Sequence, residues 1–235
     1  MKTLRSSTGR STPGPITRRF LSFIADDTFP CVGSKAALAC DAIETCELGR
    51  LGNRMNDAPL LDALATFGAG LDAAAGDDDH VVHAFVALFD GPVDTDERRF
   101  EALLWSQLQR LHDFDTRRGS AWAADVSRDP DDPRFSLSLA GHPFFVIGLH
   151  PGASRDARRF AWPALVFNSH RQFERLRADG RYAKMQAATR KRDVALQGSI
   201  NPNLADFGDA SEARQYSGRA VEPDWTCPFR PGKPR

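Results

Sequence analysis

The stretch FSLSLAGHPFFVIGL, residues 135–149, indicates a β-sheet. Apolar, aromatic and β-branched side chains dominate it, and Ala140–Gly141 interrupts it, which predicts two strands joined by a tight turn. On its N-terminal side, HVVHAFVALFDG at 80–91 is a β-branched and aromatic run typical of a buried strand. On its C-terminal side, PALVFNS at 163–169 predicts a further strand. These segments together favour a sheet in which antiparallel pairing predominates.

Helical patterns surround the predicted strands. The clearest is 94–115, where Phe100, Leu104, Leu108 and other apolar residues fall on one face, and where Asp94 or Thr95 offers a cap. We expect further helices over 17–27, over 35–44 with Ser34 as its cap, over 59–75, and over 170–180 and 181–197, which Gly180 separates. Residues 46–58, with Gly49, Gly52 and Asn53, are expected to form a loop.

The chain of 235 residues is expected to form one α+β domain, with a mixed or antiparallel-leaning sheet packed against helices. Residues 1–16 are rich in Ser, Thr, Gly and Pro and are interpreted as a flexible tail, 17–229 as the domain, and 230–235 as a C-terminal tail. From Gly198 onward the chain is rich in loops and prolines. Long loops in compact domains are more often functional than incidental, so this C-terminal region is a place to look for a site.

Charge and apolar content narrow the class of protein. Lys+Arg and Asp+Glu number 31 each, so the formal net charge is +0, and the basic excess of a nucleic-acid-binding protein is missing. The sequence contains no run of about 18 apolar residues, so it predicts no membrane-spanning helix. The N-terminus lacks the apolar core of a secretory signal. We therefore expect a cytoplasmic protein. Its four cysteines, Cys31, Cys40, Cys46 and Cys227, are expected to be reduced, and their spacing does not favour a zinc site.

Cys31 is the first candidate site residue. It follows Phe29–Pro30 and precedes Gly33 and Ser34, where a helix is expected to begin. Backbone N–H groups and the positive end of a helix dipole favour a thiolate at such a position, and Gly33 would allow a flat ligand to approach the backbone. The alternative is a small buried cysteine that packs as a hydrophobic residue. Cys227, in WTCPF, has the same two interpretations.

Two histidines and two arginines are the next candidates. His150 and His170 follow predicted strands, where site residues tend to emerge; the alternative is that each only bonds nearby backbone. Arg155 and Arg158 follow LHPGAS, and a guanidinium there can bind a carboxylate through two parallel hydrogen bonds; the alternative is a solvated loop.

The loop-rich C-terminal region supplies acidic and amide groups. Asn201 lies in SINPNL, and Glu212 lies in SEARQYSGR. Such groups suit a cationic guanidinium or amine substrate, with Glu212 or Asp206 as counter-charge. The alternative is a polar network that pins a long loop to the core.

Several of these segments together resemble one protein family. The quoted parts are FPC at 29–31, HPFFVIGLHP at 142–151, SRDARRF at 154–160, FNSHRQFE at 167–174, RDVALQGSINP at 192–202, SEARQYSGR at 211–219 and WTCPF at 225–229. They are similar to the YqcI/YcgG-like proteins, from about residue 18 to 229. The resemblance is greatest to the haem-dependent guanidine or amine N-hydroxylase branch, of the guanitoxin-biosynthesis type.

The resemblance implies a haem b cofactor and a monooxygenase that N-hydroxylates a small guanidine or amine, with O2 and an external electron donor as co-reactants. It implies Cys31 as the iron ligand, with His150 or His170 as alternatives, and Arg155 and Arg158 as propionate anchors. Glu212, His170 and Asn201 would then be the catalytic groups. A haem-binding sensor or carrier without turnover is the rival hypothesis, a small protein with no cofactor is the third, and a homodimer is an open option for the assembly.

Overall fold

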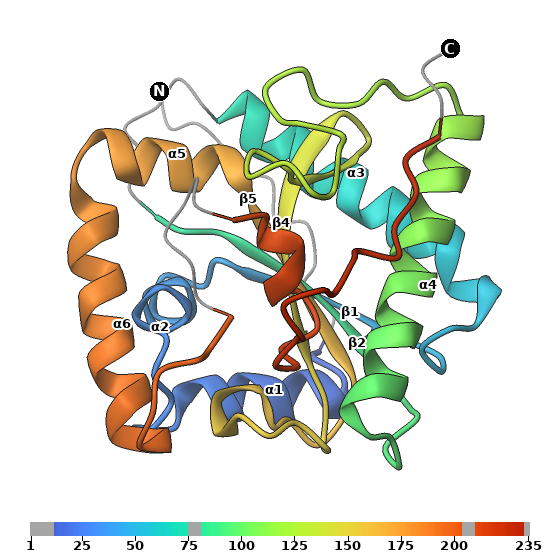
Figure 1. Cartoon of the computed structure of the whole chain (residues 1–235). Helices are drawn as coiled ribbons and strands as arrows, with labels where there is room; N and C mark the ends of the chain where they lie inside the picture. Colours follow the sequence, from blue (N-terminus) through green and yellow to red (C-terminus); the bar gives the residue numbers. More distant parts are fainter. Residues whose placement is uncertain (1–11, 75–80, 204–209, 233–235) are drawn as a thin grey trace, which may run out of the picture.

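The computed structural model describes residues 12–74, 81–203 and 210–232, which form one α+β unit built on a five-stranded mixed sheet (Figure 1). The helices are α1 (Pro15–Ala25), α2 (Val32–Ala39), α3 (Asp57–Ala73), α4 (Glu97–Arg117), α5 (His170–Ala178) and α6 (Arg181–Gln197), with short 3-10 turns η1 (Arg54–Asn56), η2 (Asp156–Arg158) and η3 (Glu212–Gln215). The strands are β1 (Ile43–Leu48), β2 (Ala84–Phe89), β3 (Leu137–Leu139), β4 (His142–Leu149) and β5 (Ala164–Ser169).

The sheet has the order β1-β2-β5-β4-β3. Strands β1 and β2 pair in parallel and the other three pairs are antiparallel, so antiparallel pairing predominates, as the sequence predicts. The predicted turn joins β3 to β4 at Ala140–Gly141, which have φ angles of 51° and 72°. Both residues occupy the left-handed region that a two-residue hairpin turn requires, and Ala140 adopts it although it carries a Cβ.

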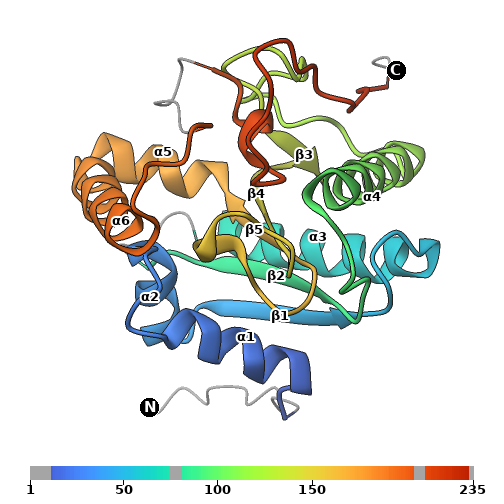
Figure 2. The same ribbon diagram turned by 60° about the horizontal axis from the view of Figure 1, so that its bottom comes forward.

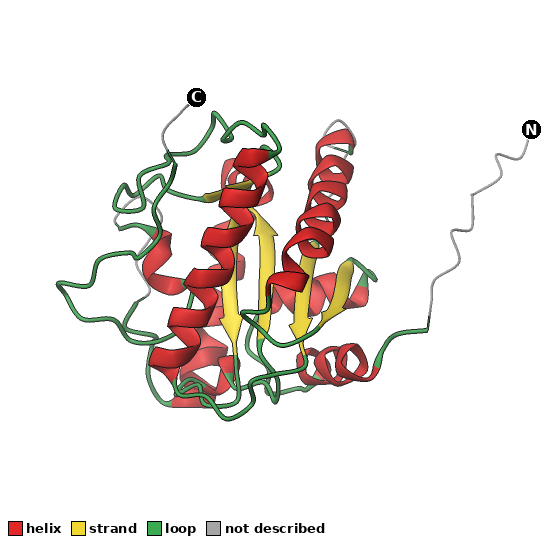
Figure 3. Ribbon diagram, turned by 90° about the vertical axis from the view of Figure 1, so that its right-hand side faces the viewer, coloured by secondary structure: helices red, strands yellow, loops and turns green. Residues whose placement is uncertain are grey.

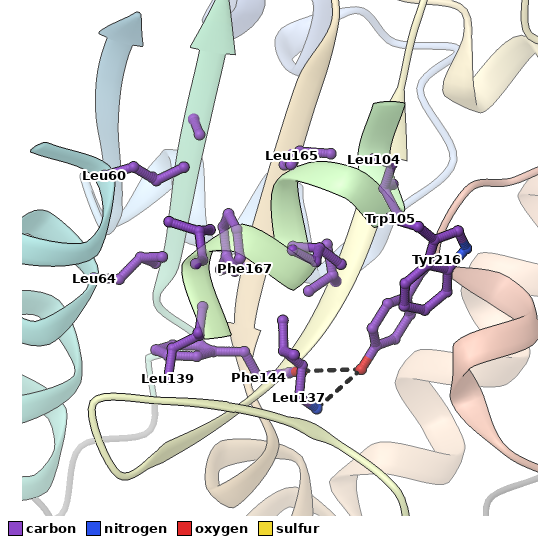
Figure 4. Close-up of a cluster of buried hydrophobic side chains, with 14 of the residues drawn as sticks. Leu60, Leu64, Leu104, Trp105, Leu137, Leu139, Phe144, Leu165, Phe167 and Tyr216 are labelled. Carbon is purple, nitrogen blue, oxygen red and sulfur yellow. Dashed lines mark hydrogen bonds between the residues drawn. The ribbon is translucent and has the colours of Figure 1, made fainter. Parts of the chain in front are cut away.

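Alternation along the strands gives the sheet two faces. One face carries Phe85, Phe144 and Phe167 and packs against α3 and α4, whose Leu64 and Leu104 are fully buried (Figure 4). The other face carries Val86, Leu149 and Ala164 and packs against α1. Helices cover the strands on both sides in Figure 3, so each face buries its apolar side chains away from water.

The loop-rich C-terminal segment completes the sheet beyond the short strand β3. The Gly148 N–H donates to the Tyr216 carbonyl at 2.7 Å, so this segment bonds to the edge of β4 that β3 leaves free. The Tyr216 hydroxyl accepts from the Leu137 N–H at 3.3 Å and donates to the Phe144 carbonyl at 3.1 Å (Figure 4). These bonds fix the position of η3, which carries the candidate residue Glu212.

The structure corrects the prediction for the region around Cys40. The helix predicted over 35–44 ends at Ala39, and Ile43–Leu48, expected to be helix end and loop, forms the edge strand β1. Asp41 has a φ of 56°, which turns the chain out of the helix. Since β1 pairs with β2 alone, its burial pattern is irregular, and the strand depends on a partner far along the chain.

Three smaller predictions are also wrong. The cap of α2 is Cys31 rather than Ser34, and the cap of α4 is Asp96, whose Oδ1 accepts from the Arg99 N–H at 2.7 Å. His112 of α4 is buried, and its Nε2 accepts from the Gly232 N–H at 3.1 Å. Helix α1 begins at Pro15, inside the segment interpreted as a tail.

Among the described residues, no helix has the length and apolarity to cross a membrane.

Candidate functional site

A pocket of about 290 Å³ lies between the second face of the sheet and the helices α1, α2 and α6. Figure 2 shows these three helices grouped around the same side of the strands. The floor of the pocket is formed by strand residues that alternate along β2, β4 and β5 and by one residue of β1: Ile43, Ala84, Val86, Phe145, Ile147, Leu149, Val166 and Asn168. All but Asn168 are apolar, so the pocket suits a largely apolar ligand.

Helix α6 forms one wall of the pocket, with Tyr182, Met185 and Thr189 among its lining residues. Its contact with α2 is close, because Thr189 Oγ1 accepts from the Val32 N–H at 3.2 Å. A Cβ at Gly33 would lie 3.2 Å from Met185 Sδ, so the glycine predicted to admit a flat ligand is packed against the Met185 thioether. None of the 17 residues of α6 is buried, and left-handed glycines, Gly180 and Gly198, bound it at both ends.

Cys31 lies on the wall of this pocket, as a candidate ligand should. It is the N-cap of α2, and its Sγ accepts a hydrogen bond from the Ser34 N–H at 3.4 Å. A small sulfur acceptor serves here where Ser, Thr, Asp or Asn would be more usual. The sulfur therefore combines an N–H donor, the N-terminus of a helix and an apolar cavity in one place.

Arg155 and Arg158 line the pocket beside Leu149, but both guanidinium groups already have partners. Arg155 pairs with Asp193 and donates to the Ser199 carbonyl at 2.8 Å. Arg158 donates to the carbonyls of Gly148 at 3.0 Å and Gln215 at 3.2 Å. Burial lowers the pKa of Arg158 to about 10, while the negative charge of Asp193 raises it, so this buried group is still a cation at neutral pH.

Asn201, predicted as a catalytic group, also lines the pocket and is 9% exposed. Its Oδ1 accepts from the Asn203 N–H at 3.0 Å. Gln215 lines the pocket as well. The structure thus brings Cys31, Arg155, Arg158 and Asn201 together around one cavity, although they come from three separate segments.

His150 lies on the other side of the sheet from these residues. Its ring stacks on Phe100 of α4 at a centroid distance of 4.2 Å, and it is 1% exposed. Burial lowers the pKa of His150 to about 4, so the ring is neutral at physiological pH. Its Nδ1 has no hydrogen-bond partner among the described residues, yet His150 is not part of the pocket lining.

His170 and Glu212 form a separate buried group outside the pocket lining. His170 Nδ1 lies 3.9 Å from Glu212 Oε2, and Glu212 Oε1 lies 3.0 Å from the Tyr216 hydroxyl. Burial raises the pKa of Glu212 to about 8, and the nearby Tyr216 hydroxyl offsets this rise only in part. Its carboxyl is therefore mostly neutral at pH 7, which does not fit the predicted role of counter-charge for a cationic substrate. Asp206, the other acid considered, lies outside the described residues.

A serine, histidine and aspartate meet elsewhere, but they do not form an open hydrolytic site. His142 Nε2 lies 2.8 Å from Ser169 Oγ, and its Nδ1 lies 3.2 Å from Asp72 Oδ2. Ser169 is 1% exposed, and its Oγ also accepts from the Gln172 N–H at 3.4 Å as the cap of α5. The Ser169 hydroxyl is buried, and both its oxygen and its proton already have partners. The three residues therefore connect β4, β5 and α3 rather than form a reactive site.

A second cavity, of about 470 Å³, lies at the C-terminal end of α4. His112, Asp115, Trp122 and Arg128 are among its lining residues. None of the residues predicted to form a site lines it, so the apolar pocket beside Cys31 is the candidate functional site. No group of three or more His, Cys, Asp or Glu in the described ranges is arranged to hold a metal ion.

The fold and pocket define a single α+β domain with a largely apolar ligand pocket between its sheet and α6. The sequence model of the YqcI/YcgG family matches residues 20–230, which is most of the chain. The chain therefore belongs to the YqcI/YcgG family. None of the curated proteins and none of the solved structures compared with it matches the chain.

Proposed function

We propose that this protein is a haem-dependent monooxygenase that N-hydroxylates a small guanidine- or amine-containing molecule. The observation that carries the proposal is the position of Cys31, whose sulfur caps α2 on the wall of an apolar pocket. Thiolate ligation of haem is the arrangement that favours oxygen–oxygen bond cleavage in oxygenases.

The residues around the pocket fit haem in their chemistry. A sulfur donor held by the Ser34 N–H faces walls that are mostly aliphatic and aromatic, as a macrocycle requires. Two cations, Arg155 and Arg158, lie at one end of the pocket. Each guanidinium would have to bind a propionate in addition to its present partners. His150 and His170 do not line the pocket, which supports choosing Cys31 as the ligand.

The pocket is small for so large a group, since ligand pockets span about 300–1,000 Å³ and this one has about 290 Å³. We infer that α6 moves outward when the pocket is filled. Its two flanking left-handed glycines and the absence of buried residues among its 17 residues support such a displacement. Contacts of α6 that would have to yield include the Thr189 bond to Val32 and the packing of Met185 on Gly33.

When bound, haem would supply the activation of O2, with two electrons from an external donor. The chain would hold the iron through Cys31 and exclude water with the apolar floor formed by Val166 and Ile147. The side-chain carbonyl groups of Asn201 and Gln215 can accept hydrogen bonds from a substrate N–H and so orient the nitrogen. Glu212 would remain a structural acid, because it is neutral at pH 7 and lies away from the pocket lining.

A haem-binding sensor or carrier is the second candidate function, and one observation favours it. Asp193 is the acid among the described residues that line the pocket, and it is paired with Arg155. A site for a cationic guanidinium would be expected to hold an unpaired carboxylate. A protein that only holds haem has no such requirement.

The test compares Cys31→Ser with Cys40→Ser after expression with haem precursor. Serine preserves the cap of α2 while removing the sulfur, and Cys40 is an exposed control. We expect haem in the wild type and the control, an altered spectrum or lost haem in Cys31→Ser, and hydroxylated product when guanidines or amines are supplied with O2 and a reductase. Identical haem spectra in both variants would remove Cys31 as the ligand, and haem without product from any substrate would favour the sensor or carrier.

A further inference from the structure

Asn168 is the one polar side chain on a floor of apolar strand residues. Along β5, Ala164, Val166 and Asn168 face the pocket side, while Leu165 and Phe167 belong to the opposite core. Asn168 is 9% exposed, and its side-chain Nδ2 has no hydrogen-bond partner among the described residues. A buried amide donor without a partner destabilises the folded chain, so its presence on a pocket floor needs an explanation.

The same chain satisfies a buried asparagine fully where the role is structural. Asn56 is 4% exposed, and its Nδ2 donates to the carbonyls of Gly49 at 3.2 Å and Arg50 at 3.0 Å. These two bonds close the loop between β1 and α3. Asn168 has no such task, since its backbone is already paired with Ala84 on β2 and Phe145 on β4.

The surroundings of Asn168 indicate what it can bind. Phe145 beside it contacts Phe173 of α5, which in turn contacts Tyr182 of α6, so this end of the pocket is aromatic. The other end begins at Leu149, four residues further along β4 and about 13 Å away at about 3.3 Å per residue. Arg155 and Arg158 lie beside that other end.

We propose that Asn168 is a ligand-binding residue whose Nδ2 donates a hydrogen bond to an acceptor oxygen of the molecule that fills the pocket. The ligand class is an elongated, mostly apolar molecule with a carbonyl or similar oxygen at the end that enters between Phe145 and Ala84. The inference rests on the pocket named in the proposed function, but not on which group binds beside Cys31. Asn168 is not among the site residues predicted from the sequence.

The experiment compares Asn168→Leu with the matched control Asn56→Leu in the full chain. Melting temperature is measured without ligand, and binding is measured with Nile red, a flat apolar dye whose carbonyl oxygen accepts hydrogen bonds. We expect Asn168→Leu to melt at the same temperature as the wild type or higher, because it removes an unsatisfied donor, while Asn56→Leu melts lower. We also expect Asn168→Leu to bind the dye about fivefold more weakly, the loss of one hydrogen bond, with emission shifted to shorter wavelength.

A lower melting temperature for Asn168→Leu together with unchanged dye affinity would overturn the proposal, because that result belongs to a structural amide. A wild type that does not bind the dye would overturn it as well. The proposed function fails separately, through the absence of haem from the wild type. Loss of dye affinity in Asn168→Leu in a protein that takes up no haem would leave the Asn168 proposal standing and remove only the cofactor.

Discussion

Replacing Glu212 with glutamine should make the protein more stable at alkaline pH. Burial raises the pKa of Glu212 from its ordinary 4.5 to about 8. Between these two values the unfolded chain has lost the proton while the folded chain keeps it, so unfolding releases a proton and stability falls as the pH rises. The contribution of the protonated carboxyl is complete below pH 4.5 and is lost by about pH 8.

The size of the effect follows from the shift. A difference of about 3.5 pKa units at about 1.4 kcal/mol each gives up to about 5 kcal/mol, which is an upper limit for a partly relaxing site. Half of that value corresponds to a melting temperature higher by about 5–10 °C in a domain of this size. Glutamine keeps the acceptor oxygen that faces the Tyr216 hydroxyl at 3.0 Å, so packing should be preserved.

The assay is thermal unfolding of the wild type, Glu212→Gln and the exposed control Glu44→Gln at half-unit steps from pH 5 to 9. We expect the difference between Glu212→Gln and the wild type to grow steadily up to about pH 8 and then level off. The control should follow the wild type throughout, because Glu44 is exposed on β1. Parallel profiles for Glu212→Gln and the wild type would refute the raised pKa of Glu212, and with it the interpretation of Glu212 as a neutral, structural acid.

Two further substitutions test the packing of α4 against β4 and the C-terminal segment, both by urea denaturation. Gly148→Ala places a Cβ 2.6 Å from Phe100 Cε1 and 2.8 Å from Leu104 Cδ1 and should cost about 1–3 kcal/mol. Gly70→Ala, inside α3 with open space around it, should instead stabilise the chain by about 0.4–1 kcal/mol; equal stabilities of the two variants would contradict this. Arg219→Met leaves Glu101 buried without the guanidinium that now lies 2.7 Å away, and it should cost about 3–5 kcal/mol of stability. Adding Glu101→Gln should restore part of that stability. A loss below about 1 kcal/mol in Arg219→Met would contradict a buried ion pair.

The sequence predicted the antiparallel part of the sheet because its signals are local. Residues 135–149 alternate in side-chain direction and carry their own turn, so strand, turn and strand could be recognised without any partner. Strand β1 was missed because Ile43–Leu48 has an irregular pattern of burial and becomes a strand through parallel pairing with β2, about 40 residues away. Parallel edge strands depend on such distant partners.

The candidate site was predicted in part, and the alternation of β4 explains one difference. Phe145, Ile147 and Leu149 face the pocket, so His150, next in the chain, faces Phe100 on the other side. That parity was available in the sequence and would have separated His150 from Cys31. The corresponding alternation along β5 places Asn168, like Val166, on the pocket floor.

Glu212 could not have been placed from the sequence. Its position depends on the bonds of Tyr216 to Gly148, Phe144 and Leu137, which join segments about 70 residues apart. Cys31 and Asn201 meet through the packing of α2 and α6, which is equally non-local. The sequence nevertheless placed Cys31 close to a helix N-terminus, although it assigned the cap itself to Ser34.

The presence of haem and its ligation by Cys31 can be read from the visible spectrum of the wild-type protein, expressed with haem precursor and recorded in its ferric, ferrous and ferrous–CO forms. We expect a strong Soret band and a red-shifted ferrous–CO complex, the signature of thiolate ligation by Cys31. A Soret band with an unshifted CO complex would contradict Cys31 as the ligand, and a colourless protein would contradict the proposal of haem in this pocket.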